Sequence, residues 1–188
     1  NCMIVEIKRI SQGDRASLRE WRNDPEVSKW MYTNHEIGEA EHNAWFDNML
    51  VDASKVYWKV VVDGDAVGAI FLTGILDPGN TCEWGMYLAD GDVRGKGVAQ
   101  AACALSFRYA FTDLGMKVVN CEAVAQNENA IGLYESVGYV RTGLQVDAVK
   151  RGDEMLSVVT LELTRESWNT IESQVLQKLH EKGVNING

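Results

Sequence analysis

The chain has 188 residues, 46% of them hydrophobic and 24% charged, a balance typical of one globular domain with a substantial core. Its formal net charge of −9 argues against nucleic acid as the principal partner, because phosphate backbones bind basic surfaces. No apolar run is long enough to cross a bilayer, and four widely spaced cysteines with three scattered histidines argue against a metal site.

The first half of the chain carries both strand and helix patterns. Residues 3–7 predict a strand, and Asp14 predicts the N-cap of the helix that follows. Further helices are expected at 26–30 and 37–50, and strands at 56–62, 67–75 and 81–89. The side chains expected to face the core from the helix at 37–50 are Ala40, Ala44, Trp45 and Met49.

The second half predicts a helix, a strand, a helix, two strands and a final amphipathic helix. Their expected positions are 98–114, 117–125, 128–136, 140–149, 155–163 and 167–182. This order predicts a single α/β domain with a mixed, mostly antiparallel sheet flanked by helices. We expect the domain at 1–166, with residues 167–188 forming a helix packed on it or extending it.

The chain ends bear on location and assembly. The N-terminus lacks a basic segment followed by an apolar one, so we expect a cytoplasmic protein with reduced thiols and no membrane partner. The amphipathic helix at 167–182 is a candidate contact between the subunits of a homodimer.

A glycine-rich turn, Arg94-Gly95-Lys96-Gly97-Val98-Ala99, joins the strand at 81–89 to the helix at 98–114. Small residues let the backbone approach a diphosphate closely, and the first N–H groups of a helix point toward it. The turn lacks the spacing of a P-loop, and Gln100 stands where a dinucleotide-binding motif needs glycine. Alone, it is as consistent with an ordinary helix start as with a phosphate site.

A second motif follows one strand and one helix later, as Asn127-Glu128-Asn129-Ala130-Ile131-Gly132-Leu133-Tyr134, ending at Gly138-Tyr139. Together the two motifs resemble the GCN5-related N-acetyltransferases (GNAT), over roughly residues 4–163. The resemblance implies acetyl-CoA as co-substrate, bound where two central strands splay apart.

The resemblance also implies which residues hold the coenzyme. Its diphosphate is expected on Arg94, Gly95, Lys96, Gly97, Val98, Ala99 and Gln100, and a side chain at Gly97 would enter that site. Free backbone groups for the pantetheine arm are expected at Tyr87, Leu88 and Ala89, with Met86 as the earliest donor and a bulge at Gly85. Asn127 is expected to cap its helix and contact the coenzyme arm. A plain buried strand is the alternative for 86–89.

Three side chains are candidates for proton transfer. In the family, the tyrosine matching Tyr134 protonates the departing thiolate; phenol and thiol pKa values are roughly 10 and 8.5. Glu83 is the favoured base for the amine, with Glu122 or water as alternatives, because both acids interrupt apolar strands. A core tyrosine and solvated glutamates would produce the same pattern.

The segment at 21–46 looks like the GNAT subgroup that acetylates a UDP-4-amino-4,6-dideoxy sugar in pseudaminic acid biosynthesis, which supplies flagellin glycosylation. Trp30 or Tyr32 could then stack on uracil, while Arg22 and His35 could contact the diphosphate. Two other acceptors remain: a protein N-terminus, as in ribosomal-protein acetyltransferases, and a polyamine, which a pI of about 4.8 favours. A catalytically idle coenzyme A-binding module is the third alternative.

Overall fold

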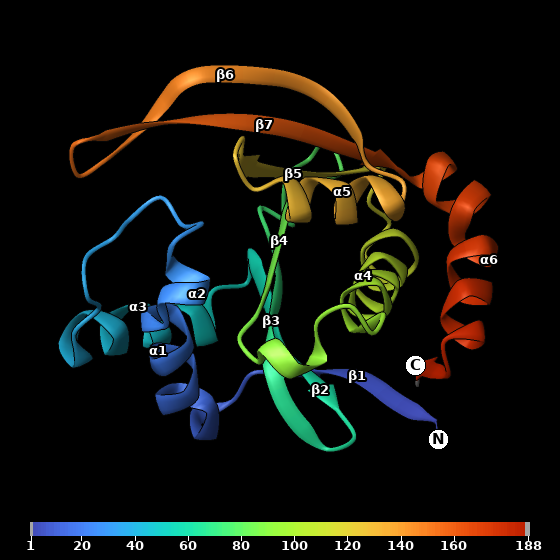
Figure 1. The fold of residues 1–188 in the computed structure, drawn as a ribbon, viewed down its shortest axis with the longest axis horizontal. Coiled ribbons are helices and arrows are strands. Elements are labelled where there is room, and N and C mark those ends of the chain that lie inside the picture. Colours follow the sequence, from blue (N-terminus) through green and yellow to red (C-terminus); the bar gives the residue numbers. More distant parts are fainter. Residues whose placement is uncertain (1, 187–188) are drawn as a thin grey trace.

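The computed structural model describes residues 2–186, and the predictions for Asn1 and for 187–188 lie outside it. One mixed sheet runs in the order β6-β7-β5-β4-β3-β2-β1-β8 (Figure 1). Its strands are β1 (Met3–Arg9), β2 (Lys55–Val62), β3 (Asp65–Thr73), β4 (Thr81–Leu88), β5 (Val118–Val124), β6 (Val140–Arg151), β7 (Glu154–Thr164) and β8 (Val184–Ile186). The α/β class and the mixed sheet predicted from the sequence are confirmed.

Helices cover both faces of the sheet. They are α1 (Arg15–Asn23), α2 (Pro25–Ser28), α3 (Glu39–Val51), α4 (Val98–Arg108), α5 (Glu128–Ser136) and α6 (Arg165–Glu181). Figure 1 shows α1, α2 and α3 on one side and α4 and α6 on the other. The main apolar cluster lies between the sheet and α4–α6, and a smaller cluster of Ile10, Leu18, Phe46 and Met49 lies under the N-terminal helices.

The two central strands, β4 and β5, pair for only part of their length. They run parallel, with partners from Thr81–Val118 to Glu83–Asn120. Beyond that point β4 stays paired with β3 as far as Leu88, and β5 stays paired with β7 as far as Val124. The strands therefore splay apart after Glu83, which leaves a gap in the middle of the sheet.

Helix α3 buries only two of the four side chains expected to face the core: Met49 is buried, and Trp45 packs partly buried against the smaller cluster. Ala40 and Ala44 are exposed, whereas His42 and Phe46 are buried with Met49. The His42 Nε2–H donates to the Arg15 carbonyl oxygen at 2.8 Å, and its Nδ1 accepts from Arg22 Nη1 at 3.2 Å. Because both ring nitrogens are satisfied, burying this histidine carries no unpaired polar group.

The C-terminal helix packs on the domain. Trp168, Val175 and Leu179 of α6 belong to the main cluster, and the Trp168 ring lies 5.1 Å from the Phe107 ring of α4. The short strand β8 then pairs in parallel with β1, which the sequence pattern did not predict. The apolar side of α6 is thus covered by its own chain, and the homodimer stays a prediction.

The opposite edge of the sheet is open. Strand β6 is exposed along most of its length, including Val140, Leu144 and Val146.

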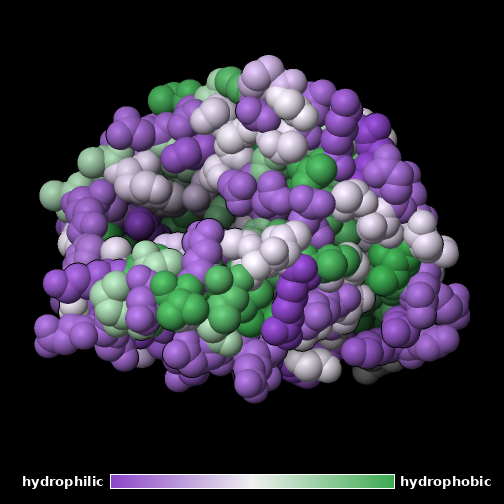
Figure 2. Space-filling view, turned by 90° about the horizontal axis from the view of Figure 1, so that it is seen from above, coloured by the Kyte–Doolittle hydropathy of each residue, from purple (hydrophilic) through white to green (hydrophobic). Residues whose placement is uncertain are grey.

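The space-filling view from above shows apolar side chains scattered among hydrophilic ones, and a hollow toward the end of the molecule where the N-terminal helices lie (Figure 2). No helix within residues 2–186 is both long and apolar enough to span a membrane.

Candidate active site

A cleft of about 390 Å³ occupies the gap between β4 and β5. Its walls come from residues 83–87 of β4, 122–124 of β5, Asn127 and Tyr134 of α5, and the segment around Trp30. Successive side chains of a strand point to opposite faces, so Glu83 faces the N-terminal helices while Trp84 faces α5. The cleft thus connects the two faces of the sheet.

The register of β3 and β4 decides which backbone groups of β4 are free. The Ala89 N–H donates to the Val67 carbonyl oxygen at 2.8 Å, and Ala69 stands opposite Tyr87. Because alternate residues of an antiparallel ladder point to the same partner strand, Tyr87 and Ala89 direct their amides to β3. The expectation of free amides at Tyr87 and Ala89 is therefore wrong.

The free positions are their neighbours. By the same alternation, Met86 and Leu88 direct their backbone groups into the gap. The Leu88 carbonyl oxygen accepts a hydrogen bond from Arg94 Nη2 at 3.1 Å, which ties the glycine turn to the end of β4. The N–H groups of Met86 and Leu88 are thus the donors that β4 offers to a ligand in the cleft.

The glycine turn fits a bound diphosphate. Gly95 and Gly97 have positive φ values of 75° and 90°, which favour glycine, and α4 begins directly after them. The Ala101 N–H already bonds the Gly97 carbonyl, so the amides of Val98, Ala99 and Gln100 remain for an anion. The first turn of α4 carries no acidic residue that would repel one.

A side chain at position 97 would point away from the diphosphate site. A Cβ built at Gly97 would meet Leu179 at 3.2 Å and Lys182 and Val184 at 3.4 Å. The expectation that its side chain would enter the diphosphate site is therefore wrong. The close approach of α6 and β8, together with the positive φ, is what requires glycine here, while Gly95 has open space around it.

Tyr134 lies on the α5 side of the cleft. Asn127 caps α5 through its side chain, which accepts from the Ala130 N–H at 3.3 Å, as expected from the sequence. The Tyr134 ring is 8% exposed and stands edge-on to Trp84 at 5.3 Å. Burial raises the pKa of Tyr134 well above its ordinary value, so the phenol keeps its proton at neutral pH.

Two carboxylates lie on the other side of the cleft. Glu83 of β4 and Glu122 of β5 both line it, and Tyr32 Oη donates to Glu122 Oε1 at 2.8 Å. Burial raises the pKa of Glu83, and the nearby negative charge of Glu122 raises that pKa further. The two alternative bases thus occupy one site, and the pKa of Glu83 lies above its ordinary value there.

The four predicted substrate residues separate into two pairs. Trp30 and Tyr32 line the cleft, and Trp30 is 38% exposed. Arg22 lies instead over the Trp45 ring at 4.2 Å, and His35 is bonded to Glu41 at 2.9 Å; neither lines the cleft. Among the described residues that line it, two are glutamates and none is Lys, Arg or His.

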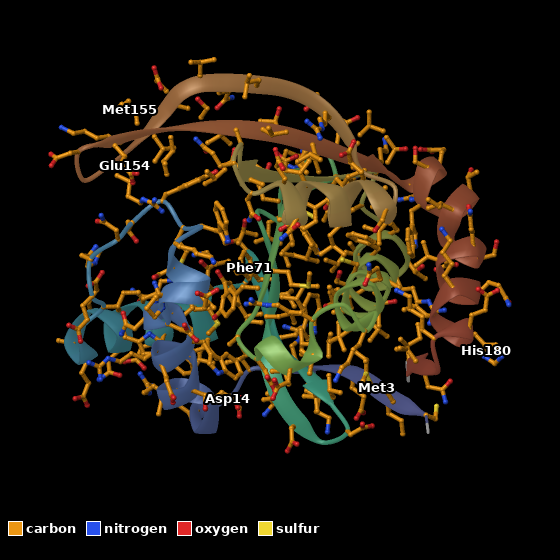
Figure 3. All side chains as sticks on the ribbon, in the orientation of Figure 1. Met3, Asp14, Phe71, Glu154, Met155 and His180 are labelled. Atoms are coloured by element: carbon orange, nitrogen blue, oxygen red, sulfur yellow. The ribbon has the colours of Figure 1, made fainter. Side chains whose placement is uncertain are left out.

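Several lining residues had no assigned role in the sequence. Phe71 of β3 lies in the middle of the sheet (Figure 3) and stacks on Tyr57 at 4.7 Å. Trp84 donates through Nε1 to Ser106 Oγ at 2.9 Å, which fixes the ring against which Tyr134 packs. Trp84 could have been found, since it follows Glu83 on a strand leading into the glycine turn, but Phe71 carries no comparable local signal. Within residues 2–186, no group of three or more possible ligands lies close enough to hold a metal ion.

The chain is similar in sequence to known acetyltransferases. A family model described as an acetyltransferase (GNAT) domain matches residues 5–140. The acetyltransferase PseH of Campylobacter jejuni is 33% identical over 135 residues, covering 70% of this chain and 82% of that protein. The putative ribosomal N-acetyltransferase YdaF of Bacillus subtilis is 22% identical over 173 residues, covering 87% and 93% respectively.

The fold also matches a solved structure. Spermidine N-acetyltransferase from Vibrio cholerae, crystallised with CoA and spermine, has a TM-score of 0.80 over 88% of this chain and 98% of that chain. At 17% identity this match shows the common fold alone.

Proposed function

This chain belongs to the GNAT acetyltransferase family, and from that membership we propose that its amine acceptor is a UDP-linked 4-amino-4,6-dideoxy sugar. The general activity of the chain is that of an N-acetyltransferase. Acetyl-CoA is the co-substrate and supplies the acetyl group as a thioester. The assignment of a UDP-linked amino sugar as the acceptor is supported by the 33% identity to PseH and by the resemblance of the segment at 21–46 to enzymes of the pseudaminic acid pathway.

The observation that carries the proposal is the mixed lining of the cleft. Trp30, Met31 and Phe71 provide apolar and aromatic surface beside Glu83 and Glu122. The C–H face and methyl group of a dideoxy sugar suit the aromatic wall, while its amine and hydroxyl groups suit the carboxylates. Trp30 is half-exposed and remains available to stack on uracil. Arg22 and His35 do not line the cleft, so we do not assign them to the diphosphate.

We assign the proton transfers to residues on opposite faces of the gap. Glu83 accepts the proton of the attacking amine, and Glu122, held by Tyr32, lies beside it. Tyr134 donates a proton on the α5 side, where the thiolate leaves. The amides of Met86 and Leu88 are placed to stabilise negative charge in the gap.

A polyamine is the second candidate, and a specific observation favours it. The cleft brings two carboxylates together with no basic residue among its described lining, and the chain carries a net charge of −9. Such a site attracts a cation more readily than a diphosphate.

Initial rates of CoA release decide among the acceptors. We expect kcat/KM for the UDP-4-amino sugar to exceed that for spermidine and for an N-terminal peptide by roughly 100-fold or more. A higher value with spermidine would assign the enzyme to the polyamines, and a higher value with the peptide would assign it to protein N-termini.

With Glu83 as the base, kcat/KM depends on pH through the pKa of this carboxyl. The deprotonated carboxylate is the active form, so kcat/KM falls when the pH drops through the raised pKa of Glu83. Glu122→Gln removes one cause of that raised pKa, and we expect the acidic limb to move to lower pH. Glu83→Gln should lower kcat by about 100-fold and abolish that limb.

Full pH profiles of the two variants, with Glu41→Gln as a control outside the cleft, check this prediction. If Glu83→Gln kept the acidic limb of the wild type, Glu83 would not be the base, and Glu122 or water would accept the proton.

A further inference from the structure

The tip of the β6–β7 hairpin reaches across the molecule to the segment that covers the acceptor side of the cleft. Arg151 Nη1 donates to the carbonyl oxygens of Lys29 at 2.6 Å and Met31 at 3.1 Å. These residues are about 120 positions apart in the chain. Figures 1 and 3 show the hairpin extending over the N-terminal helices, with Glu154 at its tip.

The contact is built into the fold. The Arg151 side chain is 14% exposed, and its Nη2 also donates to Glu154 Oε2 at 3.0 Å. The adjoining turn packs on the same segment, because a Cβ at Gly152 would lie 3.2 Å from Asn34 Nδ2. The planar guanidinium thus holds two backbone carbonyls in one geometry, which a point charge would not do.

The two carbonyls flank the residues that line the cleft. Trp30 lies between Lys29 and Met31, and Tyr32 follows directly. Trp30, Met31 and Tyr32 all line the cleft, and the Tyr32 hydroxyl holds Glu122. Fixing the backbone at 29–31 therefore fixes the aromatic wall of the acceptor side and, through Tyr32, one of the two carboxylates.

We propose that Arg151 is a positioning residue that sets acceptor affinity by holding the segment at 29–32 over the cleft. None of its hydrogen bonds or ion pairs reaches a cleft-lining side chain of β4 or α5, so we expect acetyl-CoA binding to be independent of it. The inference rests on the proposed acetylation of an amine in this cleft, whichever amine that is.

The first test needs no acceptor. Amide hydrogen exchange is compared between the wild type and Arg151→Ala, with Glu154→Ala as the matched control that removes only the exposed ion pair. We expect exchange at the Trp30 and Met31 amides, which donate to the Val27 and Ser28 carbonyl oxygens, to rise about 10-fold in Arg151→Ala and to stay unchanged in Glu154→Ala. Unchanged exchange in Arg151→Ala would overturn the inference, even if no acceptor were acetylated by the wild type.

The second test uses the best acceptor from the rate comparison. We expect Arg151→Ala to raise the acceptor KM roughly 10-fold, with kcat and the acetyl-CoA Kd within about 2-fold of the wild type. Arg151→Lys should recover part of this loss. Combined with Tyr32→Phe, the effect should be less than additive, because both substitutions release the same segment. An unchanged acceptor KM, or fully additive effects, would overturn the inference.

Discussion

Replacing Tyr134 with Phe is expected to lower kcat by about 100-fold or more, while acetyl-CoA affinity stays within about 2-fold. The tyrosine lines the cleft, and its phenol is protonated at neutral pH, so it carries a proton that can be given to a leaving thiolate. Phenylalanine keeps the edge-on packing against Trp84 and removes only the hydroxyl. The substitution therefore separates proton donation from coenzyme binding.

A matched control is available next to it. The Tyr139 ring lies 5.9 Å from the Tyr134 ring, but Tyr139 does not line the cleft. Tyr139→Phe removes the same atom from the same core, and we expect near wild-type kcat. Steady-state kinetics and calorimetry give both values. If Tyr134→Phe kept a kcat within 2-fold of the wild type, the tyrosine would have no part in the proton transfer.

The second large effect is expected from Gly68→Ala in β3. A Cβ at Gly68 would overlap the Tyr87 carbonyl oxygen and lie 2.9 Å from Leu88 Cα. Both atoms belong to the backbone of β4, which cannot rotate away as a side chain could. Relief must push β4 aside where Met86 and Leu88 face the gap. We expect the free energy of unfolding to fall by about 1–3 kcal/mol, and acetyl-CoA affinity to fall more than about 10-fold.

Gly132→Ala in α5 is the matched control, because a Cβ there meets nothing within 4 Å. The same chemical change in an open helical position should raise stability by up to about 1 kcal/mol. Urea unfolding and calorimetric titration with acetyl-CoA measure both quantities. Wild-type coenzyme affinity in Gly68→Ala would show that the backbone of β4 at 86–88 does not hold the coenzyme.

The sequence predicts best what local chemistry determines. Helix α5 spans the predicted residues 128–136, because Asn127 can cap it without help from elsewhere in the chain. The glycine turn is similar, since positive φ at Gly95 and Gly97 depends on the residue itself. These two segments were enough to identify the fold.

Features that depend on residues far apart in the chain could not be predicted from the sequence. The free amides of β4 lie at 86 and 88 because of the register with β3, which no pattern within β4 reveals. Arg22 contacts His42 and Trp45 on the N-terminal helices, so its side chain does not line the cleft. The hold of Arg151 on the segment at 29–31 joins residues from opposite ends of the domain.

The position of the CoA sulfur atom in a crystal structure of the complex tests the central claim most directly. We expect the pyrophosphate on the main-chain amides between Gly95 and Gln100, and the sulfur in the gap between β4 and β5, within hydrogen-bonding distance of the Tyr134 hydroxyl. A pyrophosphate bound elsewhere, or a sulfur separated from that hydroxyl by protein, would contradict the account.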